Sequence, residues 1–300
     1  MHVVIAGGSG FIGANLTQVL LKQQHQVTIL THSEVHKVLS RLSKHYVFAK
    51  ALLDAEFAPN RDITVMPYED YSGEGDVLIN LAGESLGAKA ITMRRLHQLE
   101  KSRTTVLDDL ASQVALPPIF IQASAVALYP NSDLSQDESA PTTGEGEIAD
   151  LARLVESKAQ ALNEQFHFKH FYLARFGIVL HRSGGLIKKA SFLPPFTVIH
   201  GDNTIPFIEL NDAIEALLLL CNGAIESGPV NFTSPCAATL KELLRCCYKH
   251  SRLPQLPIIT GFLRHSDRRI QLLSANQHIE PKVLLQNQFK FKHADISSID

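Results

Sequence analysis

The sequence has no strong excess of charge of either sign. Its 28 Lys and Arg residues nearly balance its 30 Asp and Glu residues, so the formal net charge is −2 at pH 7. Runs of basic residues are absent as well, and nucleic acids and anionic membranes attract proteins through positive surfaces. We therefore expect no nucleic-acid partner and no membrane partner.

Long apolar runs are also missing. A transmembrane helix needs about 20 consecutive apolar residues, whereas the longest candidate, Ala216–Cys221, fits a short buried helix segment. The first expected strand begins at residue 3, which leaves no room for a signal peptide, so we expect a cytoplasmic protein. Apolar residues at 45% and charged residues at 19% are typical of a globular enzyme.

Cysteine is scarce, and spacings that suit metal ligands are absent. None of the four cysteines forms a C-x-x-C motif, so we expect reduced packing thiols. His32 and His36 stand four residues apart without a third ligand beside them, and no metal site is predicted.

What the sequence does contain is a glycine-rich stretch at residues 3–13. A β-branched run there predicts a buried strand, and apolar residues at helical spacing from Ile12 to Leu20 predict a helix that begins at the glycines. In such a turn, side chains at Gly7 or Gly10 would hold the backbone away from a pyrophosphate, and Gly13 lets the helix pack close to the strand. The helix N-terminus then faces the phosphates. We predict a dinucleotide site, against the alternative of a plain structural turn.

The second predicted strand, Val27–Leu30, ends at Thr31 and His32, where the adenosine ribose is expected. Sites that prefer NAD usually carry an acid here, about 20 residues after the glycines, to bind the ribose 2′-hydroxyl. No acid occurs before Glu34. This absence favours NADP as cofactor over NAD.

Three cations lie close to this strand end. His32, Lys37 and Arg41 could face a 2′-phosphate. The alternative is a polar helix start with Ser33 as its N-cap. Both interpretations can hold together.

Strand and helix patterns alternate along the next 150 residues. Strands are predicted at Ile63–Met66, Asp76–Glu84 (which runs into a turn), Pro118–Ala123, Phe171–Val179 and Pro229–Thr233; helices are predicted at 92–115, 148–166 and 212–222. This order predicts an α/β fold, a Rossmann-like doubly wound parallel sheet over residues 1–180 and 211–234. Residues 181–210 and 235–300 are expected to form a small, mostly helical C-terminal lobe.

Three further segments carry predictions. Residues 46–57 fit no clear pattern. The loop at 130–147, rich in Asp, Ser, Thr, Gly and Pro, is long enough to predict a functional loop. The apolar stripe of helix 92–115 is either core or a subunit contact, so a homodimer is an open alternative.

Several motifs together resemble one family. Gly-Gly-Ser-Gly-Phe-Ile-Gly at 7–13 is similar to the signature of extended short-chain dehydrogenases/reductases. The rest resembles their atypical "epimerase family protein" (sugar nucleotide epimerase-like) branch, on these segments: Asn80–Glu84, Ser102-Arg103, Ser124–Tyr129, Gly228–Asn231 and Gly261–Ala294. The resemblance covers nearly the whole chain.

The resemblance implies a set of cofactor-binding residues: Gly7, Gly10, Phe11, Ile12, Gly13, Thr31, His32, Asn80, Ala82, Gly83 and Arg175. Ligands of such sheets bind beyond the carboxyl ends of the strands, which agrees with the position of Asn80 to Gly83. Arg103 is expected to join its helix to that turn.

The resemblance also implies catalytic residues. In extended reductases a serine after the fifth strand and a Tyr-x-x-x-Lys pair carry the chemistry, and Ser124 and Lys158 match the serine and the lysine. The tyrosine position is Leu154, which cannot transfer a proton. Tyr129 is a substitute acid or a packing residue, Lys158 contacts a ribose or is an exposed helix lysine, and Ser124 serves the site or its own turn.

We therefore predict an NADP-dependent oxidoreductase or epimerase-like enzyme. Its substrate would be a small molecule with a carbonyl or alcohol carbon, and the family label suggests a nucleotide-sugar. The alternative is a non-catalytic NADP(H)-binding sensor or regulatory protein, which the missing tyrosine favours.

Overall fold

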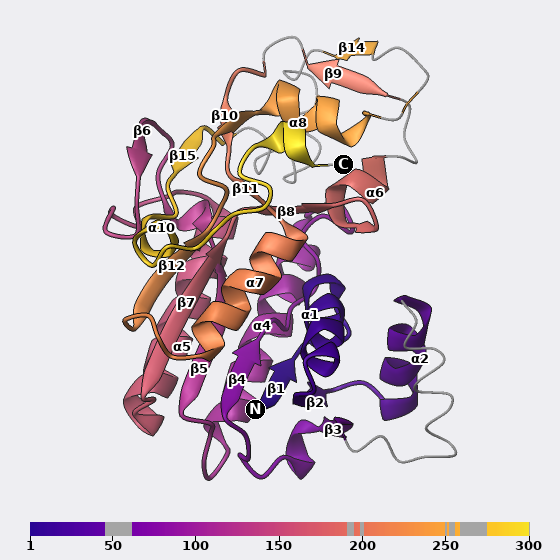
Figure 1. Cartoon of the computed structure of the whole chain (residues 1–300), viewed down its shortest axis with the longest axis vertical. Helices are drawn as coiled ribbons and strands as arrows, with labels where there is room; N and C mark the ends of the chain where they lie inside the picture. Colours follow the sequence, from indigo (N-terminus) through magenta and orange to yellow (C-terminus); the bar gives the residue numbers. More distant parts are fainter. Residues whose placement is uncertain are drawn as a thin grey trace.

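Seven parallel strands form the central sheet of the computed structural model, which describes residues 1–45, 62–190, 195–198, 201–249, 251, 256–258 and 275–299 (Figure 1). In spatial order they are β12 (Gly228–Phe232), β7 (His170–Phe176), β5 (Ile119–Ala125), β4 (Val77–Asn80), β1 (His2–Ala6), β2 (Gln26–Thr31) and β3 (Ile63–Pro67). The chain order reverses between β1 and β4, where doubly wound sheets bind their ligands. The predicted fold class is confirmed. The unassigned residues 46–57 lie outside the described part.

Helices cover both faces of the sheet. On one face lie α1 (Phe11–Lys22), α2 (Val35–His45) and α7 (Leu210–Cys221), and on the other α4 (Met93–Ala111) and α5 (Glu147–Phe166). The strands between them are almost purely apolar, and Val3 to Ala6 are fully buried, as expected for parallel strands covered on both sides. Most of the predicted stripe, including Leu99 and Leu110, is buried in the core, whereas Leu96 is half-buried and Val114 is exposed. A homodimer therefore stays a prediction without support from this stripe.

The predicted single strand Phe171–Val179 is wrong. It is two strands, β7 and β8 (Ile178–His181), separated by Gly177. A Cβ at Gly177 would lie 2.8 Å from the Pro206 carbonyl oxygen, so the chain there passes too close to its neighbour for a side chain. Strand β8 leaves the sheet and pairs in parallel with β11 (Phe207–Glu209).

The small lobe lies beyond one end of the sheet (Figure 1). It is built of short elements: α6 (Gly185–Ala190), β9 (Phe196–Val198), β10 (Thr204–Ile205), β13 (Ala238–Thr239), α8 (Leu240–Cys247), β14 (Leu256–Ile258) and the 3-10 turn η5 (Ile296–Ser298). Helix α8 begins with a capping box between Thr239 and Glu242, which satisfies backbone N–H groups at the helix start. Leu180, Phe207 and Leu243 form the centre of the lobe core.

The C-terminal segment does not stay in the lobe. Strand β15 (Gln277–Ile279) pairs with β6 (Ser132–Gln136), so the predicted functional loop at 130–147 is tied to the end of the chain. Leu284 of α10 (Lys282–Gln286) is fully buried against the core that α1 and α7 share. Residues 282–291 therefore pack on the sheet domain rather than within the lobe to which the sequence assigned them.

Candidate functional site

The turn between β1 and α1 is shaped by close backbone contacts. Gly7 has φ +83°, and a Cβ on it would lie 2.7 Å from the Ala82 nitrogen in the turn after β4. A Cβ on Gly13 would lie 2.4 Å from the Gly7 carbonyl oxygen. Both glycines are thus required by the protein's own packing. Contact with the β4 turn is thus one reason for Gly7, and its predicted place beside a pyrophosphate stays a prediction.

Gly10 is less tightly constrained than Gly7 and Gly13. Its φ is −76°, which any residue adopts, and the only described atom within 4 Å of an added Cβ is the Gly7 oxygen at 3.2 Å. Gly10 is the N-cap of α1 and provides no side-chain cap for the helix. An N-terminus without a side-chain cap, directly after a glycine turn, fits an anion such as a pyrophosphate.

Phe11 and Ile12, also predicted to bind cofactor, serve packing with their side chains. The Phe11 ring lies where Cβ atoms of Gly184 and Gly185 would stand, at 2.2 and 3.3 Å. Ile12 packs against the hydrophobic core on the sheet face that α1 covers. Their backbone N–H groups, in the first turn of α1, are the groups that could reach a phosphate.

The turn after β4 lies against the β1–α1 turn and so borders the predicted cofactor site. Asn80 is 1% exposed, donates to Gln122 Oε1 at 2.8 Å and accepts from the Ala82 N–H at 3.1 Å. Its amide therefore shapes the turn, and its contact with a cofactor stays a prediction. Gly83 has φ +152° and lies against the Arg103 side chain.

Arg103 joins α4 to this turn, as predicted. Its guanidinium donates to the Glu84 carbonyl at 3.1 Å and to the Leu99 carbonyl at 3.1 Å. Burial, with the nearby Arg95 charge, lowers the pKa of Arg103 to about 10. Arg95 is itself buried and pairs with the Glu84 carboxylate, so two arginines fix the turn to α4.

The end of β2 carries contacts of its own. Thr31 Oγ1 accepts from the Ser33 N–H at 2.8 Å. The His32 ring stacks on Tyr68 with 4.4 Å between centroids and bonds to the Asp109 carboxylate. Lys37 pairs with Glu34. His32 is thus already placed beside an anion at the strand end where a ribose is expected.

Ser124 lies at the carboxyl end of β5 and faces α5. Its hydroxyl donates to Glu156 Oε1 at 2.6 Å, and Arg175 of β7 donates to both Glu156 oxygens at 2.9 Å. Burial opposes the Arg175 charge, but the hydrogen bonds and charge of Glu156 outweigh it, so the pKa of Arg175 is above its ordinary value. The guanidinium is held by these internal partners, and a contact between Arg175 and the cofactor stays a prediction.

Glu156 was missed by sequence reasoning. Two α5 residues with small side chains, Ala152 four positions before it and Ala159 three positions after it, are both buried. Residues at these spacings share one helix face. Glu156 is therefore a charged residue on a buried helix face, and this pattern in the sequence could have indicated it.

Tyr129 is a packing residue, because its phenol is enclosed. It is 1% exposed, accepts from Arg175 Nη1 at 2.8 Å and donates to Asn231 Oδ1 at 2.8 Å. Burial raises the pKa of Tyr129, although Arg175 acts in the opposite direction. A phenol that already donates to Asn231, accepts from Arg175 and is shielded from solvent does not fit the predicted substitute acid.

Lys158 lies on the other side of α5. Two residues after Glu156, it points away from Ser124 and pairs with Asp108 of α4, with 34% of its side chain exposed. Leu154 is 36% exposed. The structure therefore does not bring Lys158 together with Ser124, and a structural ion pair is its observed role.

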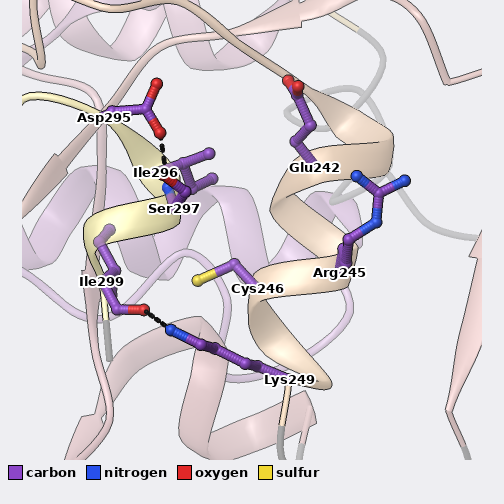
Figure 2. Close-up of a pocket in the computed structure, with 8 residues that line it drawn as sticks. All are labelled: Glu242, Arg245, Cys246, Lys249, Asp295, Ile296, Ser297 and Ile299. Carbon is purple, nitrogen blue, oxygen red and sulfur yellow. Dashed lines mark hydrogen bonds between the residues drawn. The ribbon is translucent and has the colours of Figure 1, made fainter.

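A cavity of about 260 Å³ lies elsewhere, between α8 and η5 in the lobe (Figure 2). Its walls include Arg245, Cys246 and Asp295, and burial raises the pKa of the Cys246 thiol. It contains none of the predicted site residues.

Among the described helices, none is both long and apolar enough to cross a membrane.

Comparison with known proteins agrees with this architecture. The model of the NAD dependent epimerase/dehydratase family matches residues 3–161, more than half of the chain. Epimerase family protein YfhF of Bacillus subtilis is 28% identical over 99% of this chain and 95% of its own length. Epimerase family protein SAR0825 of Staphylococcus aureus is 30% identical over 77% of this chain and 74% of its own.

Two solved structures share the fold. The human epimerase family protein SDR39U1 (isoform 2), crystallised with NADPH, superposes with a TM-score of 0.78 at 19% identity, over 99% of this chain and 97% of that one. UDP-glucuronic acid 4-epimerase from Bacillus cereus, with UDP-glucuronic acid and NAD, gives 0.71 at 15% identity, over 99% and 96%. These likenesses show the fold, and the family model that matches residues 3–161 shows that the chain belongs to the NAD dependent epimerase/dehydratase family.

Proposed function

We propose that the chain binds NADP(H) across the β1–α1 turn and uses it to exchange hydride with a carbonyl or alcohol substrate. The observation that carries the proposal is the start of α1, which follows the glycine turn and has no side-chain cap. An uncapped helix N-terminus after a glycine turn fits a pyrophosphate. When bound, the nicotinamide supplies the hydride-transfer chemistry.

The preference for NADP rests on the end of β2. Thr31 and His32 stand where an acid would bind a ribose 2′-hydroxyl, and SDR39U1 was crystallised with NADPH. The His32 ring already contacts the Asp109 carboxylate, so we expect a modest preference. About tenfold corresponds to ~1.4 kcal/mol.

Ser124 and Glu156 would handle the substrate proton. The Ser124 hydroxyl already donates to Glu156, so its oxygen is free to accept from a substrate hydroxyl. A proton could then pass from the substrate to Ser124 Oγ as the Ser124 proton moves to Glu156. A nucleotide-sugar is the proposed substrate class, by analogy with the UDP-glucuronic acid epimerase.

A second candidate is non-catalytic NADP(H) binding, as in a sensor. It is favoured by the enclosed Tyr129 phenol and by the Lys158–Asp108 pair, because both catalytic partners of Ser124 that the sequence suggested are engaged elsewhere.

Fluorescence titration with NADPH tests cofactor binding. Gly10→Val should abolish it, because the side chain would fill the pyrophosphate position. Gly87→Val is the matched control, since an added Cβ at Gly87 meets only Lys189 Nζ, at 3.6 Å. Unchanged affinity in a folded Gly10→Val variant would contradict the site.

Two further assays separate the alternatives. Calorimetry should give tighter binding for NADPH than for NADH, and equal affinities would refute the cofactor preference. Loss of NADPH absorbance with a panel of keto-sugars and small carbonyls should depend on Ser124, so Ser124→Ala should lower turnover. Tight NADPH binding without turnover of any compound would favour the sensor.

A further inference from the structure

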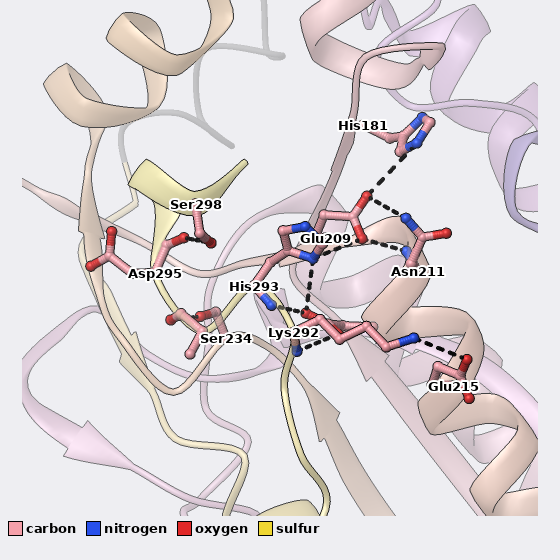
Figure 3. Close-up of polar contacts among 11 residues, drawn as sticks. His181, Glu209, Asn211, Glu215, Ser234, Lys292, His293, Asp295 and Ser298 are labelled. Carbon is pink, nitrogen blue, oxygen red and sulfur yellow. Dashed lines mark hydrogen bonds and ion pairs between the residues drawn. The ribbon is translucent and has the colours of Figure 1, made fainter. Parts of the chain in front are cut away.

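Three distant chain segments bring carboxylates and imidazoles together where the lobe meets α7 (Figure 3). Glu209 ends β11 and is the N-cap of α7, and Asp212 lies in the first turn of that helix. His293 comes from the C-terminal segment, and His181 ends β8. Glu209 is 3% exposed and Asp212 1%, whereas the His293 side chain is 27% exposed.

The two carboxylates are held in fixed positions. Glu209 accepts from the Asn211 N–H at 2.6 Å, and Asp212 accepts from the backbone N–H groups of Lys292 and His293 at 2.9 and 2.8 Å. These bonds involve uncharged donors. Two buried carboxylates side by side are costly unless a cation compensates them.

His293 Nδ1 is the unexplained atom of the cluster. It is buried and has no hydrogen-bond partner, although it lies 3.5 Å from Glu209 Oε2 and 3.7 Å from Asp212 Oδ2. A neutral imidazole with its Nδ1 lone pair facing two carboxylates would be repelled by them. Either a proton on Nδ1 or a metal ion between these three atoms removes this repulsion.

The spacing of the three atoms fits a metal ion. Zinc bonds to nitrogen and oxygen of about 2.1 Å place neighbouring tetrahedral ligands about 3.4 Å apart. The observed 3.5 and 3.7 Å are close to that edge, and all three ligand atoms lie within 4.8 Å of one another. The same separations are long for direct hydrogen bonds.

His181 is a supporting donor rather than a ligand. Its Nδ1 accepts from the Ser183 N–H at 3.1 Å, which leaves the proton of a neutral ring on Nε2. That nitrogen lies 3.9 Å from Glu209 Oε1. The arrangement leaves one open position for water on a tetrahedral ion held by Glu209, Asp212 and His293.

We propose that Glu209, Asp212 and His293 form a binding site for one Zn²⁺ ion. Imidazole with carboxylates suits zinc, whereas magnesium and calcium prefer oxygen ligands alone. The ion would attach the C-terminal segment to the β11–α7 corner and so stabilise the fold. This site is independent of the cofactor, and the sequence predicted no metal because its ligands are far apart in the chain.

Zinc titration of the chelator-treated full-length protein tests the site. Calorimetry should give one Zn²⁺ per chain with a rise in melting temperature, and Mg²⁺ should give neither. His293→Gln should lose both effects, while His97→Gln, which changes an exposed histidine on α4, should keep them.

Replacing zinc by Co²⁺ gives a readout that does not depend on stability. Visible absorption of bound Co²⁺ should appear in the wild type and in His97→Gln and disappear in His293→Gln. Zinc binding that His293→Gln leaves unchanged would overturn the proposal. So would a wild type that binds no zinc, since a proton on His293 would then be the compensating cation.

Discussion

Replacing Arg175 with methionine should strongly destabilise the fold. The Arg175 and Glu156 side chains are 7% and 14% exposed, and the guanidinium makes three hydrogen bonds, two to Glu156 and one to Tyr129. Methionine keeps much of the volume but leaves the Glu156 carboxylate buried with Ser124 as its remaining described partner. Breaking a buried ion pair from one side costs about 3–5 kcal/mol, and we expect a loss of that size in the free energy of unfolding.

Urea unfolding followed by circular dichroism measures this loss. Lys158→Met is the control, because the Lys158–Asp108 pair is 34% and 62% exposed and should be worth less than about 1 kcal/mol. The double variant Arg175→Met/Glu156→Leu should recover much of the loss, because no unpaired charge remains. The reasoning fails if Arg175→Met costs no more than Lys158→Met, or if the double variant is no more stable than the single one.

Three further predictions concern stability. Leu154→Ala should lower the free energy of unfolding by about 1 kcal/mol or less, because Leu154 is 36% exposed. Leu162→Ala on the same helix should lower it by about 2–5 kcal/mol, because Leu162 is 2% exposed, and equal losses in thermal unfolding would contradict the assigned burial. Tyr129→Phe should lower the free energy of unfolding by about 1–3 kcal/mol, because Asn231 and Arg175 each lose a buried partner. It should leave any NADPH turnover unchanged. Lost turnover in a stable variant would restore Tyr129 as the acid. The hydrogen bond from Lys282, with those from Ser139, lowers the pKa of Asp137 to about 2. The ionised Asp137 therefore stabilises the fold fully above its ordinary pKa, and this stabilisation disappears as pH falls through about 2. Asp137→Asn should flatten acid unfolding between pH 4 and pH 2, and an unchanged acid profile would exclude the Asp137–Lys282 pair as a cause of acid unfolding.

Local patterns in the sequence determined the sheet domain. A strand buried on both faces must be apolar throughout, and an amphipathic helix must repeat every 3.6 residues, so β1, α1, β4 and α4 could be placed from residue spacing alone. The glycine turn was equally legible, because strand, glycines and helix are adjacent in the chain. Only the reasons for individual glycines needed the structure, since Gly7 is required by Ala82, which is distant in sequence.

Tertiary structure alone decided which polar groups meet. The sequence placed Ser124, Tyr129, Lys158 and Arg175 near one strand edge, but the pairing of Arg175 with Glu156 encloses Tyr129, and the turn of α5 directs Lys158 to Asp108. Such partners depend on side-chain direction and on contacts between distant segments, which no local period encodes. The same reason hid the cluster of Glu209, Asp212 and His293, because the fold brings the C-terminal segment back onto the start of α7.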